Sequence, residues 1–148
     1  MMRFVKFIWP FKNSELEVNR NLYAMAVNYF NKQEYTESIK LFRAAAEFGN
    51  DGASQNYLAI LYHQGAGVGK NDLVSLYWFD KAFDNGILVA QVDRDRILNA
   101  YRIKLSSAEF YEHIMILSGW CSIGSGDIPK DANKAAYWRK ISEGTTKI

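Results

Sequence analysis

Two stretches of the chain repeat each other at a fixed spacing, and this repetition constrains the fold more than any other feature. Segments 38–49 and 75–86 lie 37 residues apart, and both begin with serine and end with glycine. Within them Phe42 matches Phe79 at the same spacing. A period of this length is typical of architectures in which small structural units stack along the chain. The sequence therefore predicts a solenoid.

Helix start signals indicate that the repeating units are α-helical. Segments 14–17 and 106–109 read Ser-x-x-Glu, the pattern of a capping box. Asn71 and Asp131 are further N-cap candidates. No useful stretch alternates with period two, so strands are not expected. The pattern predicts about seven helices, over residues 15–31, 34–48, 52–64, 72–85, 88–103, 107–122 and 131–143.

Glycines and aromatic pairs mark the boundaries and the core of the units. Gly49, Gly86 and Gly144 suit the left-handed conformation that ends many helices. A third, partial copy keeps two loop glycines at 124–126 and a Tyr-Trp pair at 137–138. Small and large residues are expected to interlock in the core. The small ones are Ala26, Ala45, Ala59 and Ala82, and the large ones are Tyr29, Phe42, Tyr62, Trp78 and Phe79.

These residues resemble the Sel-like repeat family, a relative of the tetratricopeptide repeats. The resemblance implies an all-α, right-handed α-α superhelix of about three helical hairpins in a single domain, 1–148. The expected parts are an N-terminal arm (1–13), a first repeat (14–52), a second repeat (53–86), an irregular helix (87–106) and a third repeat or cap (107–148). Residues 87–106 depart from the family pattern because Arg96 falls where a small residue is expected.

The resemblance also implies that the first helix of each hairpin lines a concave, partner-binding groove. Tyr23 and Phe30 stand outside the packing positions, so they are candidates for an interface hot spot. Alternatively, the N-terminal arm covers both rings, and the sequence leaves the two open. The predicted partner-binding residues are Tyr23, Val27, Phe30, Asn56, Ile60, His63 and Gln64.

Composition argues against several other classes of function. The net charge is +2, and segment 93–96 alternates acid and base, which predicts a solvated helix face instead of a nucleic-acid track. Cys121 is the only cysteine, so neither a disulfide nor a zinc site is expected. A reducing, cytoplasmic location follows as an expectation. Segment 65–71 lacks the spacing of a phosphate loop, and its glycines predict a turn with positive φ.

The sequence therefore predicts a protein-binding module with no catalytic residues, no cofactor and no metal. Its sharper form is a bacterial immunity protein that neutralises a cognate secreted toxin. This form is motivated by a short chain with no apparent export signal and by analogy with small Sel-like proteins found beside secreted effectors. The alternatives are a general adaptor or regulatory scaffold and a membrane-peripheral scaffold that uses residues 1–12, while a cell-wall-related enzyme is disfavoured. The oligomeric state is not predicted.

Overall fold

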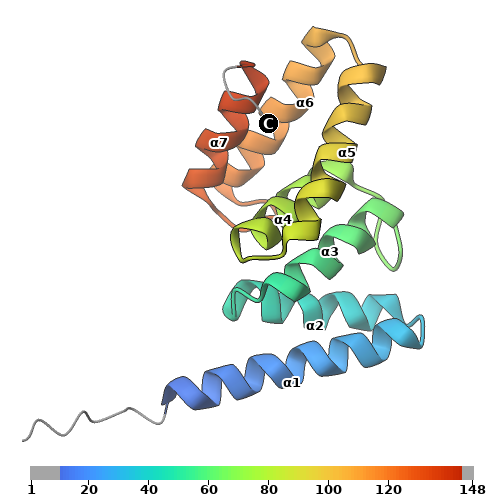
Figure 1. Ribbon diagram of the computed structural model, residues 1–148, viewed down its shortest axis with the longest axis vertical. Coiled ribbons are helices and arrows are strands. Elements are labelled where there is room, and N and C mark those ends of the chain that lie inside the picture. Colours follow the sequence, from blue (N-terminus) through green and yellow to red (C-terminus); the bar gives the residue numbers. More distant parts are fainter. Residues whose placement is uncertain (1–10, 145–148) are drawn as a thin grey trace, which may run out of the picture.

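The computed structural model describes residues 11–144, and every regular element in that range is an α-helix (Figure 1). Within it, the only β pairing is one isolated bridge between Ser125 and Ile128. The all-α prediction is therefore confirmed. The helices are α1 (Phe11–Asn31), α2 (Tyr35–Phe48), α3 (Gly52–Gln64), α4 (Asp72–Asp84), α5 (Leu88–Lys104), α6 (Ser107–Ile123) and α7 (Ala132–Ser142).

The helices pair into antiparallel hairpins that stack into a helical-repeat superhelix. The three hairpins are α1–α2, α3–α4 and α6–α7, and α5 packs along α4 between the second and the third. Figure 1 shows α1 at one end of the stack and the α6–α7 hairpin at the other. The predicted solenoid is confirmed.

The core follows the repeat pattern of small and large residues. All four predicted alanines are fully buried, and Trp78, Tyr62 and Phe42 are among the largest buried side chains. Tyr29 differs, because it is only half-buried on α1. The fully buried alanines allow the helices of a hairpin to approach closely, while the large rings fill the spaces beside them.

The loop between α6 and α7 fastens the third hairpin to the first two. The Asp127 carboxylate accepts hydrogen bonds from the Tyr62 hydroxyl at 2.7 Å and from the Arg43 guanidinium at 2.8 Å. Arg43 also donates to the carbonyl of Gly126, and Trp78 Nε1 donates to the carbonyl of Asp127 at 3.2 Å. Burial favours a higher Asp127 pKa, but these hydrogen bonds and the Arg43 charge outweigh it and lower the pKa.

A buried ionic cluster joins α4, α5 and α7. The carboxylate of Asp80 accepts from Arg94 at 2.5 Å and from the ammonium group of Lys134. Arg94 is only 5% exposed, so the prediction of a solvated face over 93–96 is wrong at this residue. The cause lies in the packing, because α5 turns Arg94 toward α4, where the buried Asp80 needs a counter-charge. The neighbouring Arg96 is exposed, as predicted.

Several helix ends follow the predicted caps. Ser106 and Glu109 form a capping box at the start of α6, and Asn71 and Asp131 cap α4 and α7 through their side chains. The predicted capping box at Ser14 is wrong, because α1 includes residues from Phe11 onward and Ser14 lies inside the helix.

The glycines behave as predicted at two of three helix ends. Gly86 and Gly144 have φ values of 88° and 68°. The prediction of a left-handed conformation at Gly49 is wrong, because its φ is −95°. The next residue, Asn50, takes that conformation instead, with φ 48°. A Cβ at Gly49 would lie 2.4 Å from Cγ of Asn19, so the absent side chain leaves room for α1.

The expected N-terminal arm meets the described structure only at its end. Residues 11–13 belong to α1, and the expectations for residues 1–10, including contact with a membrane surface, lie outside the described residues. Across 11–144, no helix has the length and apolar character needed to cross a bilayer.

A candidate groove between α3 and α5

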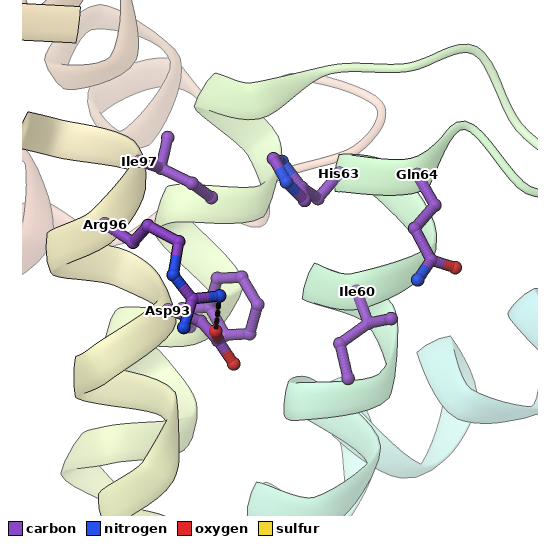
Figure 2. A pocket seen from close by; sticks show the side chains of 7 residues that line it. Ile60, His63, Gln64, Asp93, Arg96 and Ile97 are labelled. Carbon is purple, nitrogen blue, oxygen red and sulfur yellow. Dashed lines mark hydrogen bonds and ion pairs between the residues drawn. The ribbon is translucent and has the colours of Figure 1, made fainter. Parts of the chain in front are cut away.

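An open hollow of about 240 Å³ lies between α3 and α5, with α4 behind it. Figure 2 shows Asp93 and Arg96 projecting from α5 into this space, with Ile60 on the opposite side on α3. Three apolar side chains form its floor, and four polar or charged ones surround them. The lining residues are Ile60, His63, Gln64, Phe79, Asp93, Arg96 and Ile97.

A second hollow, of about 140 Å³, continues the first toward the C-terminal end of α5. The two share His63 and Ile97, so they lie side by side, and we call them together the α3–α5 groove. The second hollow adds Lys70, Asp72, Ala100, Tyr101 and Lys104.

The loop between α3 and α4 positions one end of the groove. Gly65 ends α3 with φ 71°, and Gly67 takes φ 72°, so the predicted glycine turn with positive φ is confirmed. A Cβ at Gly67 would lie 2.6 Å from Cβ of Tyr35, so the loop passes against the start of α2. The loop ends where Asn71 donates its backbone N–H to the carbonyl of Tyr62 at 2.9 Å, and Lys70 is thereby held beside the groove.

The acidic residues of the groove are already paired. His63 Nδ1 lies 2.7 Å from Oδ1 of Asp72, and Arg96 donates to Oδ1 of Asp93 at 2.7 Å. Burial and the nearby charge of Asp72 raise the pKa of Tyr101 to about 12, so this residue offers a neutral hydroxyl at ordinary pH.

The basic residues at the end of the groove are not paired in this way. Lys70 and Lys104 have no ion-pair partner among the described residues. Both side chains are exposed. At this end of the groove two ammonium groups face one carboxylate, that of Asp72, so the excess charge there is positive.

The structure brings together only some of the predicted partner-binding residues. Ile60, His63 and Gln64 line the groove. Asn56 lies one turn earlier on α3, half-buried, and its Oδ1 is buried with no hydrogen-bond partner among residues 14–144.

The predicted residues on α1 lie elsewhere. Tyr23 and Phe30 pack against Tyr57 of α3, with ring centroids 6.2 Å and 5.1 Å away, and Val27 packs on the same core. The expectation that Tyr23 and Phe30 are free of packing is therefore wrong. Tyr57 fills the α1–α2–α3 junction and also stacks on Phe42 at 4.7 Å, so these rings form part of the inter-hairpin contact.

The α5 side of the groove was not identified from the sequence, because residues 87–106 were interpreted as an irregular helix outside the repeat pattern. A signal was present, since the α5 residues of the groove recur at intervals of three and four and therefore share one helix face. These residues are Asp93, Arg96, Ile97, Ala100, Tyr101 and Lys104.

Apart from His63 and its partner Asp72, the groove lining holds no histidine or cysteine. Cys121 is fully buried, and burial raises the pKa of its thiol to about 12, which disfavours the reactive thiolate. His113 Nδ1 lies 2.7 Å from the carbonyl of Glu109 on its own helix. Across residues 11–144 no group of three or more His, Cys, Asp or Glu side chains could hold a metal ion. The arrangement is suited to binding.

The family of the chain follows from its sequence as well as from its fold. The Sel1 repeat profile matches residues 22–50, 52–87 and 117–138, more than half of the chain. The chain therefore belongs to the Sel1 repeat family. This membership favours a role as a protein–protein interaction scaffold and agrees with the predicted Sel-like resemblance.

A solved structure supports the same fold. The crystal structure of a Sel1 repeat protein from Oxalobacter formigenes is similar, with 23% sequence identity and a TM-score of 0.51. The alignment covers 93% of this chain and 63% of that protein, so this chain spans less than two thirds of the length of its structural relative. A search of curated proteins finds no significant match.

Proposed function

We propose that the chain binds a segment of a partner protein in the α3–α5 groove. The observation that carries the proposal is the presence of two adjacent hollows, of about 240 and 140 Å³, that share His63 and Ile97 along α5. Stacked helical repeats typically use such inner surfaces for binding.

The lining of the groove has the composition of a protein-binding surface. Ile60, Phe79 and Ile97 provide an apolar floor, and charged and amide side chains surround it. An apolar centre with a polar rim is the usual anatomy of a protein–protein interface. Each hollow is the size of one or two side chains, which suits anchor residues of a partner segment.

Site-specific photo-crosslinking tests the proposal in cells of the source organism. A photoreactive amino acid at Gln64, an exposed groove position, should give a discrete adduct with one protein. The same amino acid at Tyr111, an exposed residue of α6 outside the groove lining, is the matched control. Ile60→Glu should remove the Gln64 adduct while leaving the melting temperature within a few degrees. Equal adducts at both positions, or an adduct that survives Ile60→Glu, would contradict the proposal.

The finer proposal is that the partner is a secreted toxin and that the chain acts in the cytoplasm as its immunity protein. Its support is the analogy between this family and small Sel-like proteins that accompany effectors. Co-expression with the product of the neighbouring gene tests it: protection of the cells and a complex lost in Ile60→Glu are expected. If the groove holds another protein and no protection occurs, the role is that of a general adaptor.

A further inference from the structure

The α3–α5 groove is chemically different at its two ends. Toward the N-terminal end of α5 the first hollow has an apolar floor of Ile60, Phe79 and Ile97, with the Asp93–Arg96 ion pair at its edge. Toward the C-terminal end stand Lys70 and Lys104. The groove therefore has a direction, from apolar to basic.

The apolar end contains the larger hollow. Ile60 and Ile97 face it from the two helices, and Phe79 closes it from α4. At about 240 Å³ it can hold one large apolar side chain. A segment that runs along the groove therefore inserts one side chain here and presents the following side chains to the basic end.

The basic end carries excess positive charge. Asp93 is paired with Arg96, and Asp72 is hydrogen-bonded to His63, so neither carboxylate forms an ion pair with Lys70 or Lys104. The two ammonium charges outnumber the single Asp72 carboxylate in this hollow. A nucleic acid would need a longer run of cations along its phosphates. Two free ammonium groups beside an apolar hollow match an acidic side chain next to an apolar one.

Helix geometry gives the spacing between these two features. Ile97 and Lys104 lie seven residues apart on α5, a rise of about 10 Å. An extended chain covers that distance in about three residues. We propose that the groove selects an extended protein segment in which an Asp or Glu lies about three residues from a large apolar side chain. This inference rests on the proposed function of the groove.

Selection from a display library of random twelve-residue peptides tests the inference, with the full chain as bait at low ionic strength. Enriched peptides should carry Asp or Glu about three residues from Leu, Ile, Met or an aromatic residue. The double variant Lys70→Gln/Lys104→Gln should weaken the best peptide about fivefold, because exposed ion pairs each contribute modestly. High salt should remove this difference between wild type and variant. Lys32→Gln, at an exposed lysine outside the groove lining, should leave binding unchanged.

The outcomes separate this inference from the function on which it rests. Peptides that lose binding in Ile60→Glu but show no acidic preference, or bind the double lysine variant equally, overturn the inference and retain the groove. Peptides that bind Ile60→Glu as well as wild type place the binding surface elsewhere and overturn both. A selection that enriches no peptide also counts against both.

Discussion

Ser118 donates its hydroxyl hydrogen to the carbonyl of Ala135 at 2.8 Å, which reverses the arrangement in the hairpin before it. In the α3–α4 hairpin the donor is Ser75 on the second helix, and the acceptor is the carbonyl of Ala59 on the first, also at 2.8 Å. Ser118 stands at the repeat position of Ala59, and Ala135 at that of Ser75. The third hairpin therefore has the same hydrogen bond between its two helices, but the serine donor lies on the first helix and the carbonyl acceptor on the second.

This reversal predicts that a second substitution can restore the stability lost when Ser75 of the second hairpin is replaced. Ser75→Ala should lower the free energy of unfolding by about 1 kcal/mol, because a buried hydrogen bond is lost. Adding Ala59→Ser places the hydroxyl on the other helix, as in the α6–α7 hairpin, and should restore most of that loss. Urea denaturation measures both changes. A double variant no more stable than Ser75→Ala would show that the two hairpins are not equivalent in packing.

Trp78 of α4 is only 1% exposed, and its Nε1 donates a hydrogen bond to the α6–α7 loop of the third hairpin. Trp78→Ala should reduce stability by about 3–5 kcal/mol, since it leaves a large cavity in the core. The variant also removes the hydrogen bond to the carbonyl of Asp127, so hydrogen exchange should increase in the α6–α7 loop. Trp120→Ala, at a half-buried ring, should have a smaller effect. An unchanged melting temperature in Trp78→Ala would refute the repeat alignment.

The buried carboxylate of Asp80 should be more sensitive to change than any surface acid. Asp80→Asn removes the buried counter-charge that Arg94 and Lys134 share and leaves each with one more exposed carboxylate, Asp95 and Asp84. Breaking a buried pair costs about 3–5 kcal/mol, and the remaining pairs place the expected loss at the lower end of that range. Asp93→Asn removes an exposed pair with Arg96 and should change stability by about 1 kcal/mol or less. Thermal denaturation compares the two, and equal effects would contradict a structural role for the cluster.

The helices were predictable because their signals are local. Caps such as Asn71 and Asp131 act within three residues, and a 37-residue period is visible without any knowledge of packing. The buried state of Arg94 was not predictable in this way. Its partner Asp80 lies on another helix, and an alternating run of acids and bases looks the same whether it faces water or a buried carboxylate.

The groove was predictable on one side only. The register transferred from the family places Ile60, His63 and Gln64 on the face of α3 that lines the groove, because α3 belongs to a regular repeat. The same register does not bring Tyr23 and Phe30 to this groove, since both rings pack against Tyr57, and a register contains no information about ring size.

Stability should depend on pH through Asp131, the N-cap of α7. Burial favours a higher pKa, but the backbone N–H of Lys134 and the charge of Lys81 outweigh it, so the pKa of the folded state is lowered. The contribution of Asp131 is therefore present above the unfolded pKa of about 4 and is lost as pH falls through the lower folded value. Asp131→Asn keeps a capping side chain but removes the charge, so its unfolding free energy should fall less steeply below pH 4. Parallel slopes for wild type and variant would contradict this assignment.

The glycines of the α3–α4 loop should differ in their tolerance of alanine, because only one of them meets another helix. Gly67→Ala combines a positive φ of 72° with a Cβ 2.7 Å from the backbone N of Thr36, and should cost more than about 2 kcal/mol. Gly86→Ala, between α4 and α5, is the comparison: it shares the positive φ, 88°, but its Cβ would have no atom within 4 Å, so it should cost only the conformational penalty of about 1–2 kcal/mol. Gly69→Ala has neither constraint and should be nearly neutral.

Chemical denaturation measures the stabilities of these three glycine variants. Binding in the groove is a second, independent measurement. Because the loop positions Lys70, Gly67→Ala should also weaken the photo-crosslink from Gln64, whereas Gly86→Ala should not. If both variants lose the same stability, the close approach to α2 contributes nothing. If Gly67→Ala loses stability but retains the full crosslink, the loop supports the fold without positioning the groove.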